Sequence, residues 1–433
     1  MRFVLLFPIA ALIACAPGPS PERLARSWTP EALLQLKAVA AAAPQEGLPS
    51  EQAALDELRR YETAARNDDA AVQQIDVAAD ALFASLARSF AQGAADPARA
   101  DVNWAIEPPL PPDLEALQAA RAAGADVGPL LRNLLPRNAA YLALREELAR
   151  AVAEPPRALD ESGRDRDTRI ATLRANLERW RWLPRDLPAS RVEVRLPQTE
   201  VVLYRDGAPA SRHSAIVGAR ETPTPSFAAE VRSVTLNPSW TPPSQIVRQE
   251  LLPEFRRNPA AAAQRGFDVI DSRGAVVDPA LVDWSVRPFP YRLRQRPGPA
   301  NALGRLRFDL PNPFAVYLHD TPNRALFARE TRLFSHGCIR VDDPVGLAEG
   351  ILQDPEWTRD TLQAAIDASS TQTIAVAAPV PVFVLYFTAT IDDAGAVIFH
   401  DDIYDRDQIL VSQLDAPDAS LVAQASRPAR CSI

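Results

Sequence analysis

Residues Tyr317–Pro344 read YLHDTPNRALFARETRLFSHGCIRVDDP and hold two of the four histidines and one of the three cysteines of the 433-residue chain. Within this stretch, 15 residues separate His319 from the run Ser-His-Gly-Cys at 335–338. The thiolate is the nucleophilic form of cysteine, so a catalytic cysteine needs an imidazole or a cation nearby. His319, His336 and Arg340 supply such groups, and the stretch therefore predicts a Cys/His site.

The glycine before the cysteine fits this interpretation. Gly337 allows a tight turn that brings backbone N–H groups close to the Cys338 thiol, as an oxyanion hole requires. Two other interpretations of Cys338 remain at this level: a small buried hydrophobic residue, and a zinc ligand together with His319 and His336. A structural zinc site needs a fourth ligand, and no second cysteine or histidine cluster nearby supplies one.

The pattern of a histidine, 15 residues and then Ser-His-Gly-Cys-Ile-Arg resembles the signature of the L,D-transpeptidase family. YLHDTP and SHGCIR follow that signature without a departure, and the similar region spans residues 169–404. The resemblance implies a β-rich catalytic domain with Cys338 at the edge of a sheet. It implies Cys338 as the nucleophile and His319 as the general base, and it argues against an inert cysteine.

The neighbours of Cys338 have supporting roles in this interpretation. The backbone N–H groups of Gly337 and Cys338, with the Tyr317 hydroxyl as a third donor, would form the oxyanion hole. Ser335 and His336 would orient the thiol and its loop rather than act as the base.

For Arg340 and for Trp240, two interpretations remain open. Arg340 either binds a carboxylate of the substrate in a bidentate contact or braces the loop through Asp342 or Asp343. Trp240, in NPSWTPP, is either a wall of the substrate groove or a core tryptophan. The histidines outside the motif are expected at the surface or in the core.

The N-terminus has the pattern of an export signal. Arg2 is followed by the apolar run VLLFPIAALIA, which is too short to span a bilayer and is typical of a signal peptide. The residues LIAC at 12–15 resemble a lipobox, which implies that Cys15 is lipidated; ordinary cleavage nearby is the alternative. We therefore expect an exported, periplasmic protein that is anchored to a membrane through a lipid on Cys15.

The net charge and the cysteine content further limit the possible functions. The formal net charge of -8 argues against a nucleic-acid surface. Once Cys15 is lipidated, Cys338 and Cys431 are the remaining thiols, and a disulfide between them would remove the nucleophile. Cys431 lies near the chain end in a polar tail, which argues against that bond.

The periodicity changes along the chain from helical to extended. Apolar residues recur at helical spacing between residues 51 and 155, which predicts a helical domain of roughly four to six helices. From residue 188 the period becomes two, with Asp206-Gly207 as a hairpin turn, which predicts a β-rich domain. Asp343-Pro344 predicts the start of a short helix after the motif. The expected fold class is α+β: an all-helical scaffold domain followed by a β-rich catalytic domain with an inserted cap.

The expected boundaries follow from these changes and from the resemblance, since long members of the family carry a helical scaffold ahead of the catalytic domain. The expected segments are a signal peptide (1–15), a Pro/Ala-rich tether (16–50), the helical scaffold (51–155), a linker and connecting helix (156–187), the catalytic domain (188–412) and a tail (413–433). Residues 246–310 are expected to form a cap over the active site, with an ordinary surface excursion as the alternative. The short linker after the scaffold implies that a separate peptidoglycan-binding module is missing.

The resemblance and the export signal together imply a peptidoglycan L,D-transpeptidase. Cys338 would attack the carbonyl between the third-position diamino acid and the terminal D-Ala of a stem tetrapeptide, and a thioester would remain. The side-chain amine of a second stem would then form the cross-link. No cofactor or metal is expected. The expected partners are the donor and acceptor stem peptides and the membrane, with other cell-wall synthesis proteins as further candidates.

Two other functions remain open at this level. One is a cysteine hydrolase of the L,D-carboxypeptidase type, in which water resolves the thioester on the same stems. The other is a non-catalytic, envelope-binding lipoprotein that uses the helical domain. The intact set of His319, His336, Cys338 and Arg340 argues against the second of these.

Overall fold

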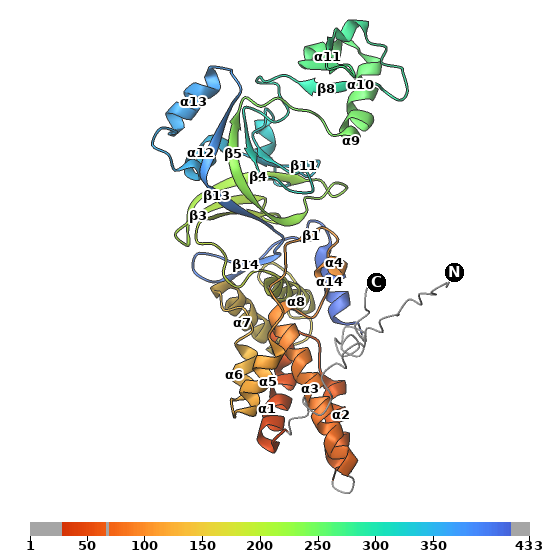
Figure 1. Cartoon of the computed structure of the whole chain (residues 1–433), viewed down its shortest axis with the longest axis vertical. Coiled ribbons are helices and arrows are strands. Elements are labelled where there is room, and N and C mark those ends of the chain that lie inside the picture. The colour runs from red at the N-terminus through yellow and green to blue at the C-terminus, as the bar shows by residue number, and fades with distance from the viewer. Residues whose placement is uncertain (1–27, 66–68, 417–433) are drawn as a thin grey trace, which may run out of the picture.

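The computed structural model describes residues 28–65 and 69–416, and it is an elongated molecule (Figure 1). Helices between residues 30 and 153 form one end, a β-sheet lies in the middle, and a small cap lies at the opposite end. The expected α+β class is therefore confirmed. The signal peptide with Cys15, and Cys431 in the tail, lie outside the described residues.

The helical domain packs around one apolar core. Its helices are α1 (Pro30–Ala42), η2 (Ala43–Glu46), α2 (Gln52–Ala64), α3 (Asp69–Gln92), α4 (Pro97–Ala100), α5 (Leu114–Ala122), α6 (Val127–Arg132) and α7 (Ala139–Ala153). The side chains of Thr29, Asp113 and Asn138 accept from backbone N–H groups in the first turns of α1, α5 and α7 and so begin these helices. Residues at the predicted helical spacing, such as Leu86 and Leu144, are buried in the core.

The predicted tether is wrong for the residues that the structure describes. Residues 30–42 form α1, and Leu33, Leu36 and Val39 are buried in the helical core. Pro30 occupies the first helical position, where its missing N–H has no intrahelical partner to lose. A Pro- and Ala-rich composition is therefore compatible with a helix, because alanine has the highest helix propensity.

The connecting helix α8 (Arg166–Trp182) is buried where the helical and β-rich parts meet. Within this helix, Arg179 and Arg181 are almost fully buried. Arg179 Nη1 lies 2.5 Å from Asp407 Oδ1, and Arg181 Nη2 lies 2.8 Å from Glu178 Oε2. Buried charges persist where each is paired, and the Arg179–Asp407 pair joins α8 to the helix at 406–414.

The β-rich part is built on a sheet that closes on itself. Its strands are β1 (Trp104–Ala105), β2 (Arg191–Arg195), β3 (Glu200–Arg205), β4 (Ala208–Gly218), β5 (Ser226–Leu236), β9 (Leu306–Asp309), β10 (Leu318–His319), β11 (Leu333–Ser335), β12 (Ile339–Val341) and β13 (Gln372–Leu385). The order runs β5, β13, β2, β3, β4, β12, β10, β9, and β9 pairs again with β5. In this order β10 pairs directly with β12, which brings the two halves of the motif together.

Two local predictions are confirmed within this part. Asp206 and Gly207 join β3 to β4 with φ angles of 51° and 82°, as a two-residue hairpin turn requires. Helix α12 (Pro344–Leu352) follows the motif, and the Asp343 side chain accepts from the Gly346 N–H at 3.1 Å. With α13 (Arg359–Asp367), α12 adds to the sheet's apolar core the side chains Leu347, Ile351, Leu362 and Ile366.

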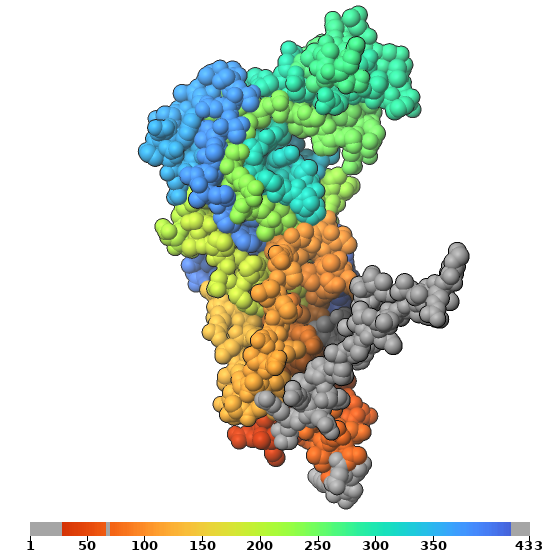
Figure 2. Space-filling view, in the orientation of Figure 1, coloured from red at the N-terminus to blue at the C-terminus, as the bar shows by residue number. Residues whose placement is uncertain are grey.

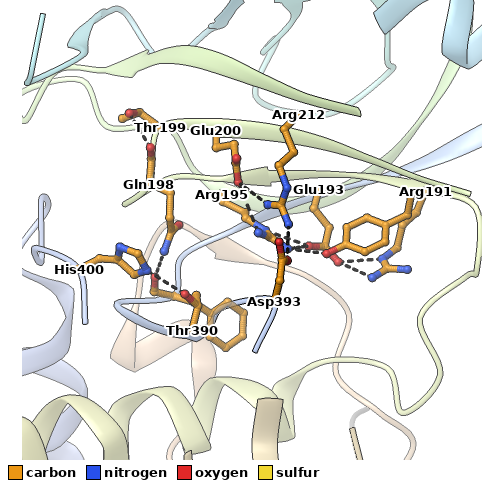
Figure 3. A network of polar contacts seen from close by, with 12 residues as sticks. Arg191, Glu193, Arg195, Gln198, Thr199, Glu200, Arg212, Thr390, Asp393 and His400 are labelled. Carbon is orange, nitrogen blue, oxygen red and sulfur yellow. Dashed lines mark hydrogen bonds and ion pairs between the residues drawn. The ribbon is translucent and has the colours of Figure 1, made fainter. Parts of the chain in front are cut away.

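After β13 the chain returns to the helical domain. The hairpin of β14 (Ala389–Ile391) and β15 (Val397–Phe399), followed by α14 (Arg406–Leu414), packs against α7 and α8. Figure 3 shows the polar contacts between this region and the outer face of β2–β4: Gln198 donates to the Phe387 carbonyl, and Arg212 lies 3.2 Å from Asp393. The end of the predicted catalytic segment therefore holds the two domains together.

The inserted cap lies between β5 and β9 and has its own core. It holds α9 (Ser244–Ile246), η3 (Val247–Leu251), α10 (Leu252–Arg257), α11 (Ala260–Gln264), η4 (Pro279–Leu281) and a sheet of β7 (Val276–Val277), β6 (Phe267–Ile270) and β8 (Arg292–Gln295). Phe255 packs edge-on against Phe267 and Trp284, with ring centroids 5.5 and 5.1 Å apart. Figure 2 shows the cap as a lobe of its own beyond the sheet.

None of the helices within 28–65 and 69–416 has the length and apolar content to cross a membrane.

Candidate active site

Cys338 lies in a tight loop between β11 and β12, and its side chain is a half-buried free thiol. Gly337 has a φ of 105°, which explains why glycine occupies this position. Ser335 closes the loop, because its Oγ accepts from the Gly337 N–H at 3.1 Å and donates to the Cys338 carbonyl. Through these contacts Ser335 can fix the direction in which the thiol points.

A segment that the sequence analysis did not select supports this loop from behind. Thr224 is fully buried; its Oγ1 donates to the Gly337 carbonyl at 3.0 Å and accepts from the Gly218 N–H at 2.9 Å. Thr222 Oγ1 donates to the Ser335 carbonyl at 3.1 Å. The only signal for these threonines in the sequence is the dipeptide repeat TPTP, which indicates a loop and no more.

His319 lies on β10 and is only 4% exposed. In the register of the sheet it pairs with Arg340 of the parallel strand β12. The backbone carbonyl of Asp320 can only accept, so His319 Nδ1 carries the hydrogen in their contact and Nε2 is left as the proton acceptor. Burial and the Arg340 cation lower the pKa of His319 to about 3, while the backbone carbonyls of Asp320 and Leu303 oppose that shift.

The thiol is also kept in its neutral form. Burial raises the pKa of Cys338, and the Tyr317 backbone N–H and the Arg340 guanidinium act in the opposite direction. Within the described residues no hydrogen bond joins Cys338 to His319; the thiol instead faces the Ala315 carbonyl, with Sγ and O 3.9 Å apart. At neutral pH the site therefore holds a thiol and a neutral imidazole, and the thiol proton must leave as the sulfur attacks.

Arg340 has no carboxylate partner in the part of the chain that the structure describes, and its Nε is buried without a hydrogen-bond partner there. The predicted brace through the following aspartates is wrong. Asp343 caps α12 and pairs with Arg359, and Asp342 Oδ1 lies 3.9 Å from His213 Nδ1. The guanidinium next to the thiol is therefore available to an anionic group from outside the chain.

Tyr317 contributes its backbone to the site. Its backbone N–H acts to lower the pKa of the Cys338 thiol, and its carbonyl accepts from the Ile339 N–H at 2.9 Å. The Tyr317 ring lies 5.2 Å from the Arg307 guanidinium, which stacks over it. The role of the Tyr317 hydroxyl as an oxyanion donor stays a prediction.

The cap touches the active-site loop through His336. Its Nε2 lies 2.5 Å from Oε1 of Glu250 in η3, and both side chains are about half exposed. Trp240, at the base of the cap, exchanges backbone hydrogen bonds with Gln295, and its ring packs against Phe267 at 6.2 Å. Of the two interpretations of Trp240, these contacts support the core tryptophan.

The described residues contain no cluster of three or more histidine, cysteine, aspartate or glutamate side chains that could hold a metal ion. Glu250, Asn312 and Ala315 lie close to the motif in space, but the sequence analysis did not select them. Their signal is weak, because they stand in loops or helix turns without a recognisable spacing from Cys338.

Two parts of the chain match known families. Residues 189–376 match the YkuD family, described as the L,D-transpeptidase catalytic domain, and residues 25–148 match a family described as a scaffold domain. The second match begins ahead of α1, in agreement with the place of α1 in the helical core. The predicted resemblance to the family is therefore confirmed at the level of domains.

One curated protein and several solved structures are similar to parts of this chain. A Haemophilus influenzae protein named "Putative L,D-transpeptidase" is 36% identical over 217 residues, which are 50% of this chain and 44% of that protein. The chain thus spans less than half the length of this relative. L,D-transpeptidase structures from Mycobacterium smegmatis and Enterococcus faecium are 15% and 12% identical, each over 46% of this chain and over 58% and 50% of theirs, and both have a TM-score of 0.21. Scores at this level do not bear on the fold. By these matches, the chain carries an L,D-transpeptidase catalytic domain at residues 189–376, joined to an N-terminal scaffold domain at residues 25–148.

Proposed function

We propose that this protein is a peptidoglycan L,D-transpeptidase that joins third-position diamino acids of two stem peptides through a Cys338 thioester. The observation that carries the proposal is the placement of Cys338 beside β10, whose buried His319 pairs in register with Arg340. This placement lies inside the segment that matches the catalytic family. It gathers a thiol, a proton acceptor and a cation, which are the groups that acyl transfer through a cysteine needs.

In the first step, the Cys338 sulfur attacks the carbonyl carbon between the diamino acid and D-Ala of the donor stem. The thiol proton passes to His319 Nε2 as the C–S bond forms, because neither group is charged beforehand. The backbone N–H groups of Gly337 and Cys338 stabilise the oxyanion. His319 then returns the proton to the nitrogen of D-Ala, which leaves, and the thioester remains.

In the second step, the side-chain amine of another stem attacks the thioester carbon. The amine gives a proton to His319, the C–S bond breaks, and the Cys338 sulfur takes that proton back. Arg340, which lacks a carboxylate partner among the described residues, binds a stem carboxylate. One peptide bond replaces another, so the reaction needs no energy-rich co-substrate.

The alternative is an L,D-carboxypeptidase-type hydrolase. The half-buried thiol favours it, since water can reach Cys338. Incubation with a disaccharide-tetrapeptide and mass analysis of the products separates the two. A cross-linked dimer that has lost one D-Ala supports the transpeptidase, whereas tripeptide alone supports the hydrolase.

We further propose that the protein acts in the periplasm, held to a membrane by a lipid on Cys15. The motif LIAC at 12–15 supports this proposal. Growth with a labelled fatty acid should label the wild type in the membrane fraction and leave a Cys15→Ala variant unlabelled. Equal labelling of both proteins, or of neither, would count against the anchor.

A further inference from the structure

The segment between β9 and β10 carries a strained residue that faces the thiol. Ala315 has a φ of 53°, a left-handed conformation that is unusual for a residue with a side chain. Its carbonyl oxygen lies 3.9 Å from the Cys338 sulfur. Strain of this kind persists only where the surrounding structure enforces it, and it is concentrated at functional sites.

Asn312 enforces this conformation. Its Nδ2 donates to the carbonyls of Leu310 and Val316 at 2.7 and 2.8 Å, and its Oδ1 accepts from the N–H groups of Phe314 and Val316 at 3.1 and 3.2 Å. One side chain thus spans the whole turn and uses both of its donor hydrogens and its acceptor.

The Ala315 carbonyl has a single donor within residues 28–65 and 69–416, and that donor is the Cys338 thiol. When the sulfur forms a thioester, its hydrogen is gone and the carbonyl loses this donor. The oxygen then lies beside the thioester with its hydrogen-bonding capacity unused. A group that brings an N–H to this place restores the hydrogen bond.

An amine is suited to this position. One of its hydrogens can bond to the Ala315 oxygen at about 2.9 Å. Its lone pair can then approach the thioester carbon within the near-attack range of about 3–3.5 Å. Its other hydrogen remains for His319 Nε2. A neutral carbonyl also has an advantage over a carboxylate, because a carboxylate would favour the charged ammonium, which cannot attack.

We propose that the Ala315 carbonyl, held in place by Asn312, binds the attacking amine of the acceptor stem in the second step. This inference rests on the proposed transpeptidase function. It makes Asn312 a positioning residue for the acceptor: it touches neither substrate, and it acts through the direction of one backbone carbonyl. The first step, in which the thiol attacks the donor, has no need of this contact.

Two variants remove the contact by different routes. Asn312→Ala removes the side chain that spans the turn. Ala315→Val disfavours the left-handed conformation, because a β-branched residue rarely adopts it. Asn237→Ala is the matched control: Asn237 also bonds two carbonyls, of Ile366 and Ser370, but away from the thiol.

Single-turnover mass spectrometry measures the two steps separately. Thioester formation from a disaccharide-tetrapeptide gives the first rate, and decay of the thioester against the concentration of added acceptor stem gives the second. We expect Asn312→Ala and Ala315→Val to slow the second step at least tenfold, to change the first less than threefold, and to raise the share of tripeptide. Asn237→Ala should leave the ratio of the two rates unchanged.

Other outcomes would overturn the inference. A parallel fall of both rates in the two variants would mean that the turn has a general structural role. An unchanged second rate would mean that the carbonyl does not bind the acceptor. Failure of the wild type to form any thioester would instead contradict the proposed function itself, so the two failures can be told apart.

Discussion

His336 Nε2 lies 2.5 Å from Glu250 Oε1, so the loop that carries Cys338 is in direct contact with the cap. The two side chains are 45% and 49% exposed, and even a fully charged pair at such an exposure contributes only about 0–1 kcal/mol to stability. The contact is therefore too weak to hold the fold together. It can, however, set where the cap rests relative to the active-site loop.

Glu250→Gln should loosen the cap without unfolding the protein. We expect faster hydrogen exchange in residues 244–257 and in the loop 333–341, together with a change in unfolding free energy below about 1 kcal/mol. Glu254→Gln is the matched control, since Glu254 lies in α10 of the same cap but pairs with Arg265. Equal rates of hydrogen exchange in the loop 333–341 of both variants would show that the His336 contact does not link the cap to the loop.

The buried His319 should make the protein less stable in acid. Its pKa is about 3 in the folded protein and about 6.5 in an unfolded chain, so the unfolded state binds an extra proton between these values. This part of the stability is complete above pH 6.5 and is lost as the pH falls towards 3. Between pH 7 and pH 5 the unfolding free energy of the wild type should fall by about 2 kcal/mol more than that of a His319→Gln variant.

Urea unfolding at the two pH values measures this difference. The other buried histidines titrate in both proteins, so the comparison isolates His319. A loss that is the same in wild type and variant would mean that His319 is not held neutral by its surroundings.

Thr224 should control the active-site loop from behind. Thr224→Val keeps the shape of the side chain but removes the hydrogen bonds to the Gly337 carbonyl and from the Gly218 N–H. Two buried backbone groups lose their partner, which should destabilise the protein by about 1–3 kcal/mol for each group. The rate at which iodoacetamide alkylates Cys338 should also change severalfold. Thr224→Ser keeps the hydroxyl. A loss of unfolding free energy in this variant as large as that in Thr224→Val would mean that the hydrogen bonds of the hydroxyl do not hold the loop.

The junction of the two domains should depend on Asp407. Its carboxylate lies 2.5 Å from Arg179 Nη1 and accepts from Thr388 Oγ1 at 2.6 Å. Asp407→Asn leaves the buried Arg179 cation uncompensated, so we expect a loss of about 3–5 kcal/mol in urea unfolding. The exposed pair of Arg59 and Asp56 is the comparison, and Asp56→Asn should cost less than about 0.5 kcal/mol. A small loss in both variants would mean that the junction is not held by its charges.

The features that can be predicted from the sequence are those that depend on residues close together along the chain. The turn at Asp206-Gly207 and the helix start at Asp343-Pro344 are set by local chemistry, and both were found as expected. The Cys338 motif is also local, apart from His319, and a characteristic spacing makes that pair recognisable.

What the sequence does not predict depends on contacts between distant segments. Thr224 and Gly337 are 113 residues apart, and Arg179 and Asp407 are 228 residues apart. Helical periodicity alone does not predict which distant segment will pack over Arg179. Residues 30–42 were predicted as part of a tether for a different reason: their composition fits a tether and a helix equally well, and only the packing of α1 against the core decides between them.

The most direct test of the central claim is the intact mass of the protein after incubation with a disaccharide-tetrapeptide, in wild type and in Cys338→Ala. We expect a wild-type adduct with the mass of the donor less D-Ala, absent from the variant and removed by hydroxylamine. We also expect product formation to fall at least about 10³-fold in the variant. Product formed at a similar rate by Cys338→Ala, or product without any adduct on Cys338, would contradict the central claim.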